Sequence, residues 1–133
     1  MDLKRVVVTG LGTVNPLGNS IPEFWENAIA GVSGAGPITN FDTNSIQTKV
    51  KIGCQVKNFD ISQYMDRKEA RKLDKYSQFA VASAVQAIQD SALDLEKEDL
   101  NRIGVILGFG MGGVDSFEEG VDSYVPYAGS LKD

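Results

Sequence analysis

Side chains that carry nucleophilic and acid–base chemistry are scarce in this sequence. Its 133 residues include no histidine and a single cysteine, Cys54, in the stretch KIGCQV. A nucleophilic cysteine is normally activated by a base such as histidine or by a helix start, and Cys54 opens no obvious helix. We therefore predict Cys54 to be a small, buried, inert side chain. The chain by itself cannot be a complete histidine-dependent enzyme, and one cysteine excludes an internal disulfide.

Two glycine-rich turns could in principle hold phosphate groups. The first has Gly10 and Gly12, but Asn15 stands where the dinucleotide pattern requires a third glycine. The second, GFGMGG at 108–113, does match G-x-G-x-x-G between an expected strand and an expected helix. No strand follows it to carry a ribose-binding acid. We favour turns that let two backbones pass closely, with a dinucleotide-binding fragment kept as an alternative.

A cluster of basic residues is the most informative polar feature. It comprises Arg67, Lys68, Arg71, Lys72 and Lys75, in a chain whose net charge is −5 and whose isoelectric point is about 4.7. On one continuous helix, positions 67, 71 and 75 would form a line. Such a cluster is either a solvated helix face or a docking patch for an acidic partner. The net negative charge argues against a general nucleic-acid binder.

The remaining polar and apolar patterns point to an ordinary soluble protein. Carboxylates between residues 115 and 122 share a face of an expected helix, and we interpret them as solvated, with no metal site predicted. No run of 18 apolar residues could span a membrane, and the first ten residues do not form a signal peptide. We therefore expect a reduced, cytoplasmic protein.

The amino-terminal half contains clear signals for strand and helix. A β-branched run at 6–9, closed by a glycine, predicts a buried parallel strand. Ser20 and Glu23 form a capping-box pattern for a helix that Gly31 ends. Trp25 is predicted to lie in the core on the apolar face of this helix. An edge strand is expected within 49–56 and one helical turn within 60–65.

The carboxyl-terminal half has a stronger helical pattern. Asp66 is predicted to cap one long helix that fades near 91–93. A charged connection or short helix at 95–100 leads to a second strand at 103–107. A helix over 114–125 is expected to end at Pro126. This order predicts a layered α/β fold, and because two parallel strands cannot form a stable covered sheet, we expect the chain to be incomplete.

Four stretches together resemble a known family. They are RVVVTGLGTVNPLGNS at 5–20, FWENAIAGVSGAGPITNFDT at 24–43, RKEARKLDKYSQFAVASAVQAIQDS at 67–91 and RIGVILGFGMGGVDSFEE at 102–119. In order and spacing they look like the start of a β-ketoacyl-[acyl carrier protein] synthase of the type II, long-chain kind. The resemblance implies a thiolase-like fold with αβαβα layers, of which residues 1–133 would form only the opening part of the first half, without a complete second domain.

The same resemblance implies an activity and its partners. Members of the family condense an acyl group with malonyl-carrier protein, release CO2 and work as homodimers without a metal or cofactor. Their catalytic cysteine and two histidines would lie outside this chain, which leaves it with no catalytic residue of its own. Lys68, Arg71 and Lys72 match the acyl-carrier-protein docking surface, and Met111 matches the side chain that gates the acyl pocket. A non-catalytic, chain-length-factor-like subunit is the alternative within this fold.

Overall fold

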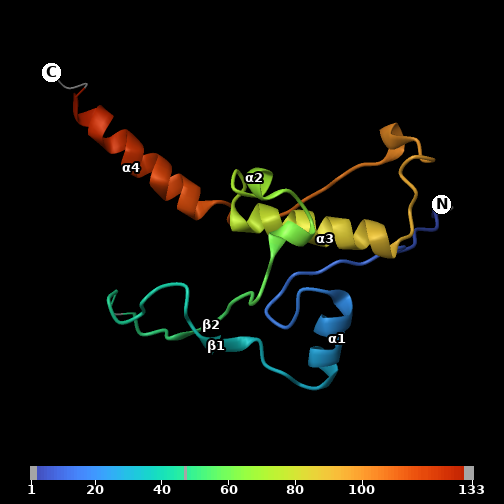
Figure 1. Cartoon of the computed structure of the whole chain (residues 1–133), viewed down its shortest axis with the longest axis horizontal. Helices are drawn as coiled ribbons and strands as arrows, with labels where there is room; N and C mark the ends of the chain where they lie inside the picture. The colour runs from blue at the N-terminus through green and yellow to red at the C-terminus, as the bar shows by residue number, and fades with distance from the viewer. Residues whose placement is uncertain (1–2, 47, 131–133) are drawn as a thin grey trace.

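The computed structural model describes residues 3–46 and 48–130 as an extended arrangement around one central helix (Figure 1). Its elements are α1 (Ile21–Ile29), β1 (Ala35–Pro37), β2 (Ile52–Cys54), η1 (Ile61–Gln63), α2 (Arg67–Ala70), α3 (Lys75–Asp90), η2 (Leu100–Arg102) and α4 (Val114–Ser130). Helix α3 crosses the centre, and α4 projects away from the other elements.

Helix α1 begins and ends where its sequence predicts. The Ser20 side chain accepts a hydrogen bond from the Glu23 amide at 3.4 Å. The Glu23 carboxylate turns back one residue further than in a standard capping box and accepts from the Asn19 amide at 2.7 Å. The helix closes at Ala30, and Gly31 follows with φ of +69°, a left-handed conformation that glycine adopts without steric cost.

The apolar face of α1 is not covered by the described residues. Trp25 is 62% exposed and Ile29 is 70% exposed, so the prediction that Trp25 lies in the core is wrong. The contact that holds α1 is polar instead, because the Asn27 side chain donates to the Leu17 carbonyl at 2.7 Å. A helix with an uncovered apolar face of this kind needs a further packing partner.

The two predicted buried strands are also wrong. Residues 6–9 and 103–107 are not in strands, and Val6 and Ile106 are 88% and 97% exposed. A strand requires a neighbour to pair its amide and carbonyl groups, and no described segment pairs with either run. The edge strand expected within 49–56 is confirmed by β2, which pairs antiparallel with β1 in the register Ala35↔Cys54.

The shorter predicted elements are partly confirmed. The turn expected within 60–65 is η1, capped by the Asp60 side chain, and the connection near residue 100 contains η2. Helix α4, in contrast, continues to Ser130 rather than ending at Pro126. Proline removes one backbone hydrogen bond from a helix and bends it, but does not force it to stop.

Helix α3 holds the amino-terminal segment by close backbone contact. A Cβ atom at Gly12 would lie 1.9 Å from the Ser83 carbonyl oxygen, and one at Gly10 would lie 2.2 Å from that of Ala87. Neither position could accept a side chain without displacing the backbone of α3. The interpretation of this first glycine turn as a site of close backbone approach is therefore confirmed.

Gln86 of α3 joins three segments through one side-chain amide. Its Oε1 accepts from the Thr13 amide at 3.1 Å. Its Nε2 donates to the Asn19 carbonyl at 2.8 Å and to the Tyr64 hydroxyl at 2.9 Å. Because these partners come from before α1 and after η1, Gln86 fixes both segments against α3.

Apolar burial is small for a chain of this length. Among the residues whose burial the structure describes, the buried hydrophobic ones are Ala70 and Ala82, at 3% and 0% exposure. Large apolar side chains such as Val8, Phe117 and Met111 are more than two-thirds exposed. In the described ranges, no helix is both long enough and apolar enough to cross a membrane.

This exposure predicts that residues 1–133, produced alone, melt without cooperativity. The burial of two alanine side chains stabilises the fold very little. Ordering the backbone costs ~1–2 kcal/mol for each residue, which this burial does not offset. Circular dichroism should show a broad thermal transition, and a dye for apolar surface should bind before heating. A sharp melt of a monomer, with little dye binding, would contradict this expectation.

Candidate functional site

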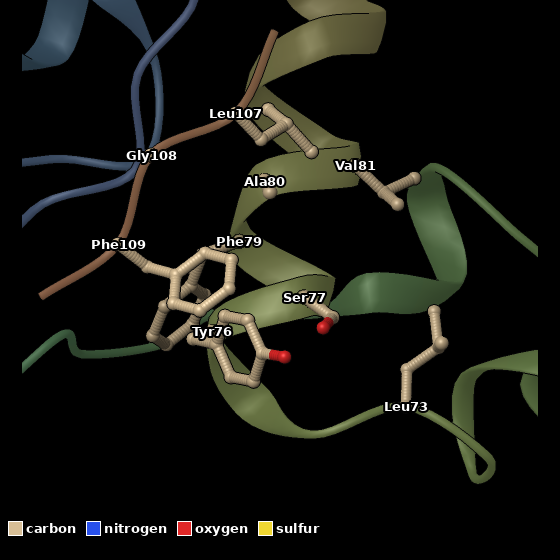
Figure 2. A pocket seen from close by; sticks show the side chains of 9 residues that line it. All are labelled: Leu73, Tyr76, Ser77, Phe79, Ala80, Val81, Leu107, Gly108 and Phe109. Carbon is tan, nitrogen blue, oxygen red and sulfur yellow. The ribbon is translucent and has the colours of Figure 1, made fainter. Parts of the chain in front are cut away.

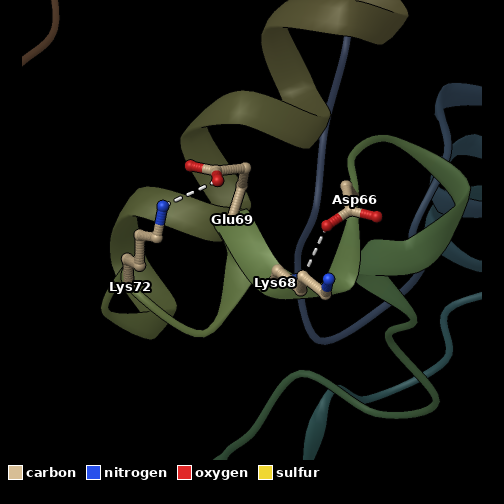
Figure 3. Close-up of polar contacts among 4 residues, drawn as sticks. All are labelled: Asp66, Lys68, Glu69 and Lys72. Atoms are coloured by element: carbon tan, nitrogen blue, oxygen red, sulfur yellow. Dashed lines mark hydrogen bonds and ion pairs between the residues drawn. The ribbon is translucent and has the colours of Figure 1, made fainter.

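The basic cluster begins at a well-capped helix start. The Asp66 side chain accepts a hydrogen bond from the Lys68 amide at 2.7 Å, as predicted for this cap (Figure 3). A carboxylate at this position also interacts favourably with the positive end of the helix dipole. The cap thereby fixes the first turn, from which the Lys68 side chain extends into solvent.

The single long helix predicted from Asp66 is wrong, because the chain breaks after α2. Arg71 is the C-cap of α2, and Asp74 precedes α3 as its N-cap. Gln78, only 8% exposed, donates from Nε2 to the carbonyls of Ala70 and Leu73, both at 2.9 Å. At the break the Ala70 carbonyl also accepts from the Leu73 amide at 3.1 Å, and the buried Gln78 amide gives both carbonyls a further hydrogen-bond donor.

The break divides the basic side chains between two surroundings. Arg67, Arg71 and Lys75 line a shallow cavity of about 260 Å³ together with Asp60 and Gln78. Lys72 instead forms an ion pair with Glu69 at 2.7 Å, in which both side chains are mostly exposed (Figure 3). The straight line of positions 67, 71 and 75 on one helix therefore does not exist.

Each of the predicted docking residues is nevertheless exposed to solvent. Lys68, Arg71 and Lys72 are all exposed, within α2 and the turn that follows it. The Lys72–Glu69 pair contributes only about 0–1 kcal/mol at such exposure, so Lys72 can exchange this partner for another carboxylate. The arrangement can attract an acidic surface, and it holds no group placed for bond-making chemistry.

Asp60 supplies a carboxylate beside this cluster. Its pKa is lowered mainly by the hydrogen bond from the Ser62 hydroxyl, at 2.7 Å, and next by that from the Ser62 amide, at 2.9 Å. The positive charge of Arg67 adds to the effect. Asp60 therefore stays ionised at neutral pH, and it reduces the net positive charge of the cavity that Arg67, Arg71 and Lys75 line.

The second glycine turn lies against the start of α3. The Phe109 and Tyr76 rings have centroids 5.1 Å apart, and a cavity of about 440 Å³ lies between α3 and residues 107–109 (Figure 2). Its lining is mostly apolar and comprises Leu73, Tyr76, Ser77, Phe79, Ala80, Val81, Leu107, Gly108 and Phe109. An apolar cavity of this kind suits a hydrocarbon group.

Met111 lies beside this cavity rather than in its wall. It is 79% exposed and lines a second, more open cavity with Gly112, Gly113, Val114 and Phe117. Met111 was the residue predicted to lie at the acyl pocket. Tyr76 and Phe109, which line the apolar cavity, were not predicted as site residues. Their aromatic character was visible, but their pairing depends on contact between segments about 30 residues apart.

Cys54 is exposed, so its predicted burial is wrong. It ends β2 in a two-stranded sheet, on which no described segment packs closely enough to cover the side chain. In the described part of the chain, no three histidine, cysteine or acidic residues lie together as a metal site would require.

The amino-acid sequence matches one family over nearly its whole length. Residues 3–130 correspond to the family described as "Beta-ketoacyl synthase, N-terminal domain". This chain belongs to the β-ketoacyl synthase family.

Relatives of this ketoacyl synthase chain carry a consistent name. It is 43% identical over 115 residues to 3-oxoacyl-[acyl-carrier-protein] synthase 2 of Staphylococcus aureus (strain COL), covering 86% of the chain and 27% of the relative. The enzymes of the same name from Synechocystis sp. and Vibrio cholerae are 41% and 42% identical, covering 90% of the chain and 28% of each relative. The ketoacyl synthase chain thus spans little more than a quarter of the length of these relatives.

Solved ketosynthases share its fold. One is a type II PKS acyl-carrier protein in complex with its ketosynthase, matched with a TM-score of 0.71, 27% identity, and coverage of 92% of this chain and 30% of that one. The ishigamide ketosynthase/chain length factor matches with a TM-score of 0.70 and 24% identity, with the same coverage. The predicted thiolase-like α/β fold is confirmed by these ketosynthase neighbours.

The role of Gln78 in this site can be tested by truncation. In the full-length protein, Gln78→Ala should leave the Ala70 carbonyl with the Leu73 amide alone and remove the Gln78 donor from the Leu73 carbonyl. The free energy of unfolding should fall by about 1–3 kcal/mol, because two hydrogen bonds of a buried amide are lost. Hydrogen exchange should accelerate at the amides of 70–73 while the middle of α3 keeps its protection. The matched control is Gln89→Ala on the exposed side of α3, and equal acceleration in both variants would refute the role assigned to Gln78.

Proposed function

We propose that this chain is the amino-terminal part of an elongating β-ketoacyl-[acyl carrier protein] synthase of fatty-acid biosynthesis. The observation that carries the proposal is the match of residues 3–130 to the family, together with relatives named 3-oxoacyl-[acyl-carrier-protein] synthase 2. The reaction joins an acyl thioester to malonyl-carrier protein. It yields 3-oxoacyl-carrier protein, one released thiol and CO2.

The reacting groups of such an enzyme would lie outside residues 1–133. Thioester exchange requires a nucleophile, and decarboxylation requires donors that stabilise the developing oxyanion. The chain has no histidine, and its one cysteine is exposed on β2, at a strand end rather than a helix start. The contribution of residues 1–133 is therefore to recognise the carrier and to form part of the acyl-binding surface.

Carrier recognition is assigned to Lys68, Arg71 and Lys72. Their exposure on α2 and the turn after it supports docking of an acidic, phosphopantetheine-bearing acyl carrier protein. A basic patch on a chain of net charge −5 would steer such a partner without attracting polyanions in general. The solved ketosynthase in complex with its acyl-carrier protein supports this kind of partner.

Acyl binding is assigned to the second glycine turn. Met111 is proposed to gate the acyl pocket, since an unbranched thioether side chain can change rotamer at low cost. The apolar cavity beside Tyr76 and Phe109 supports the presence of a hydrocarbon site at this end of α3. We assign a homodimer to the full-length protein in the cytoplasm, and the uncovered apolar face of α1 supports further packing partners.

A chain-length-factor-like subunit is the second candidate. It would share the fold and lack the nucleophile, and the 133 residues contain no reacting group that separates the two. Incubation of the full-length protein with radiolabelled acyl-carrier protein distinguishes them. An enzyme forms a covalent acyl-protein adduct, whereas a non-catalytic subunit does not.

Charge reversal tests the docking assignment in the full-length enzyme. The triple variant Lys68→Glu, Arg71→Glu and Lys72→Glu should raise KM for acyl-carrier substrates by about tenfold or more, because attractive pairs become repulsive. KM for acyl-coenzyme A, which does not use this surface, should change little. Steady-state kinetics with both donors provide the measurement.

The matched control reverses three exposed basic residues elsewhere, Lys49, Lys97 and Arg102, and so changes the net charge equally. Only the docking variant should discriminate between the two donors. If both variants raise the two KM values to the same extent, these three residues do not form the docking surface.

A further inference from the structure

Asp74 connects the proposed docking surface to the glycine turn. It occupies the N-cap position of α3, yet its side chain makes no capping hydrogen bond there. One of its carboxylate oxygens, Oδ1, instead accepts a hydrogen bond from the Ser116 hydroxyl in the first turns of α4, 42 residues further along the chain. The side chain of this N-cap residue thus binds a distant segment rather than the start of its own helix.

The glycine turn is shaped around this carboxylate. A Cβ atom at Gly113 would lie only 1.8 Å from Asp74 Oδ2, so a larger residue there would require either the carboxylate or the turn to move. A Cβ atom at Gly112 would lie 3.3 Å from the ring of Tyr76. Tyr76 and Asp74 therefore contact the two residues that directly follow Met111.

On its other side, Asp74 belongs to the segment that carries the docking charges. Arg71 and Lys72 lie three and two residues before it, respectively, between α2 and α3. The Gln78 amide donates to the Asp74 carbonyl at 3.0 Å, while its side chain holds the carbonyls of Ala70 and Leu73. Gln78 thus binds the backbone at both ends of the turn that joins Arg71 and Lys72 to Asp74.

We propose that Asp74 is a positioning residue that couples carrier docking to the placement of the Met111 turn. Contact of an acidic carrier with Arg71 and Lys72 shifts the turn between α2 and α3, and the Asp74–Ser116 hydrogen bond passes this shift to residues 109–116. The selectivity for acyl-chain length then depends on whether the acyl group arrives on a carrier protein. Coupling of this kind is reciprocal, so an acyl chain against the turn also changes carrier affinity.

The inference rests on the proposed function and is tested in the full-length enzyme. The variants are Ser116→Ala, Asp74→Asn and the two combined, with Ser116→Thr restoring the hydroxyl. The matched control is Ser123→Ala, which removes a hydroxyl from the same helix, where it donates only to the Gly120 carbonyl within α4. The measured quantity is the ratio of kcat/KM for a long acyl chain to that for a short one, with carrier-bound and coenzyme A-bound donors.

With carrier-bound donors, Ser116→Ala and Asp74→Asn should each change this ratio by about tenfold, as expected for the loss of one charge-assisted hydrogen bond. The double variant should change it no further, because both substitutions break the same contact. Ser116→Thr should restore the ratio. With coenzyme A-bound donors the ratio should stay constant. Additive effects, equal effects on both donors, or an equal effect of Ser123→Ala would overturn the inference.

Hydrogen exchange provides a readout that does not require Asp74→Asn to fold. Adding holo-carrier protein to the unsubstituted enzyme should alter exchange at residues 107–117 and at 68–74, and Ser116→Ala should abolish only the first response. A 107–117 response that is absent in the unsubstituted enzyme, or persists in Ser116→Ala, overturns the coupling. Failure of the unsubstituted enzyme to condense acyl and malonyl groups overturns the proposed function instead.

Discussion

Several described segments that are far apart in the sequence are held by contacts with α3 and its N-cap residue. Gln86 and Asp90 bind the backbone of residues 11–19, and Gln78 closes the turn after α2. At its start, Asp74 lies against Gly113 and binds the Ser116 hydroxyl, and the Tyr76 ring contacts that of Phe109. Because hydrogen bonds are directional, they set the register of each segment along the helix even where apolar burial is slight. The positions of the predicted docking residues and of the apolar cavity consequently both depend on α3.

Few apolar side chains, in contrast, are buried among the described residues. Val6–Thr9 and Ile103–Leu107 have the composition of buried strands, yet their side chains are largely exposed. A parallel strand gains stability only when neighbours pair its backbone and helices cover both faces. The same shortage explains the exposed Trp25 on α1 and the exposed Cys54 on β2, each predicted to be inside.

Predictions from the sequence succeeded where a signal depends on a few neighbouring residues. The caps at Ser20 and Asp66 and the glycine after α1 lie where expected, since each pairs groups less than five residues apart. The same local approach failed at the turn between α2 and α3. The helical spacing of residues 67–91 continues through that turn, and the amide of Gln78 that stabilises it comes from the following helix.

The sequence by itself determined the family, the thiolase-like fold class, the positions of the caps and the lack of histidine. Those properties follow directly from the order and the types of the residues. Only the tertiary structure decided that the basic cluster is split by a turn, that Met111 lies outside the cavity beside Tyr76 and Phe109, and that Asp74 binds Ser116. Such contacts join segments tens of residues apart, and their geometry follows from packing and hydrogen bonding across the fold, which no local pattern of residues encodes.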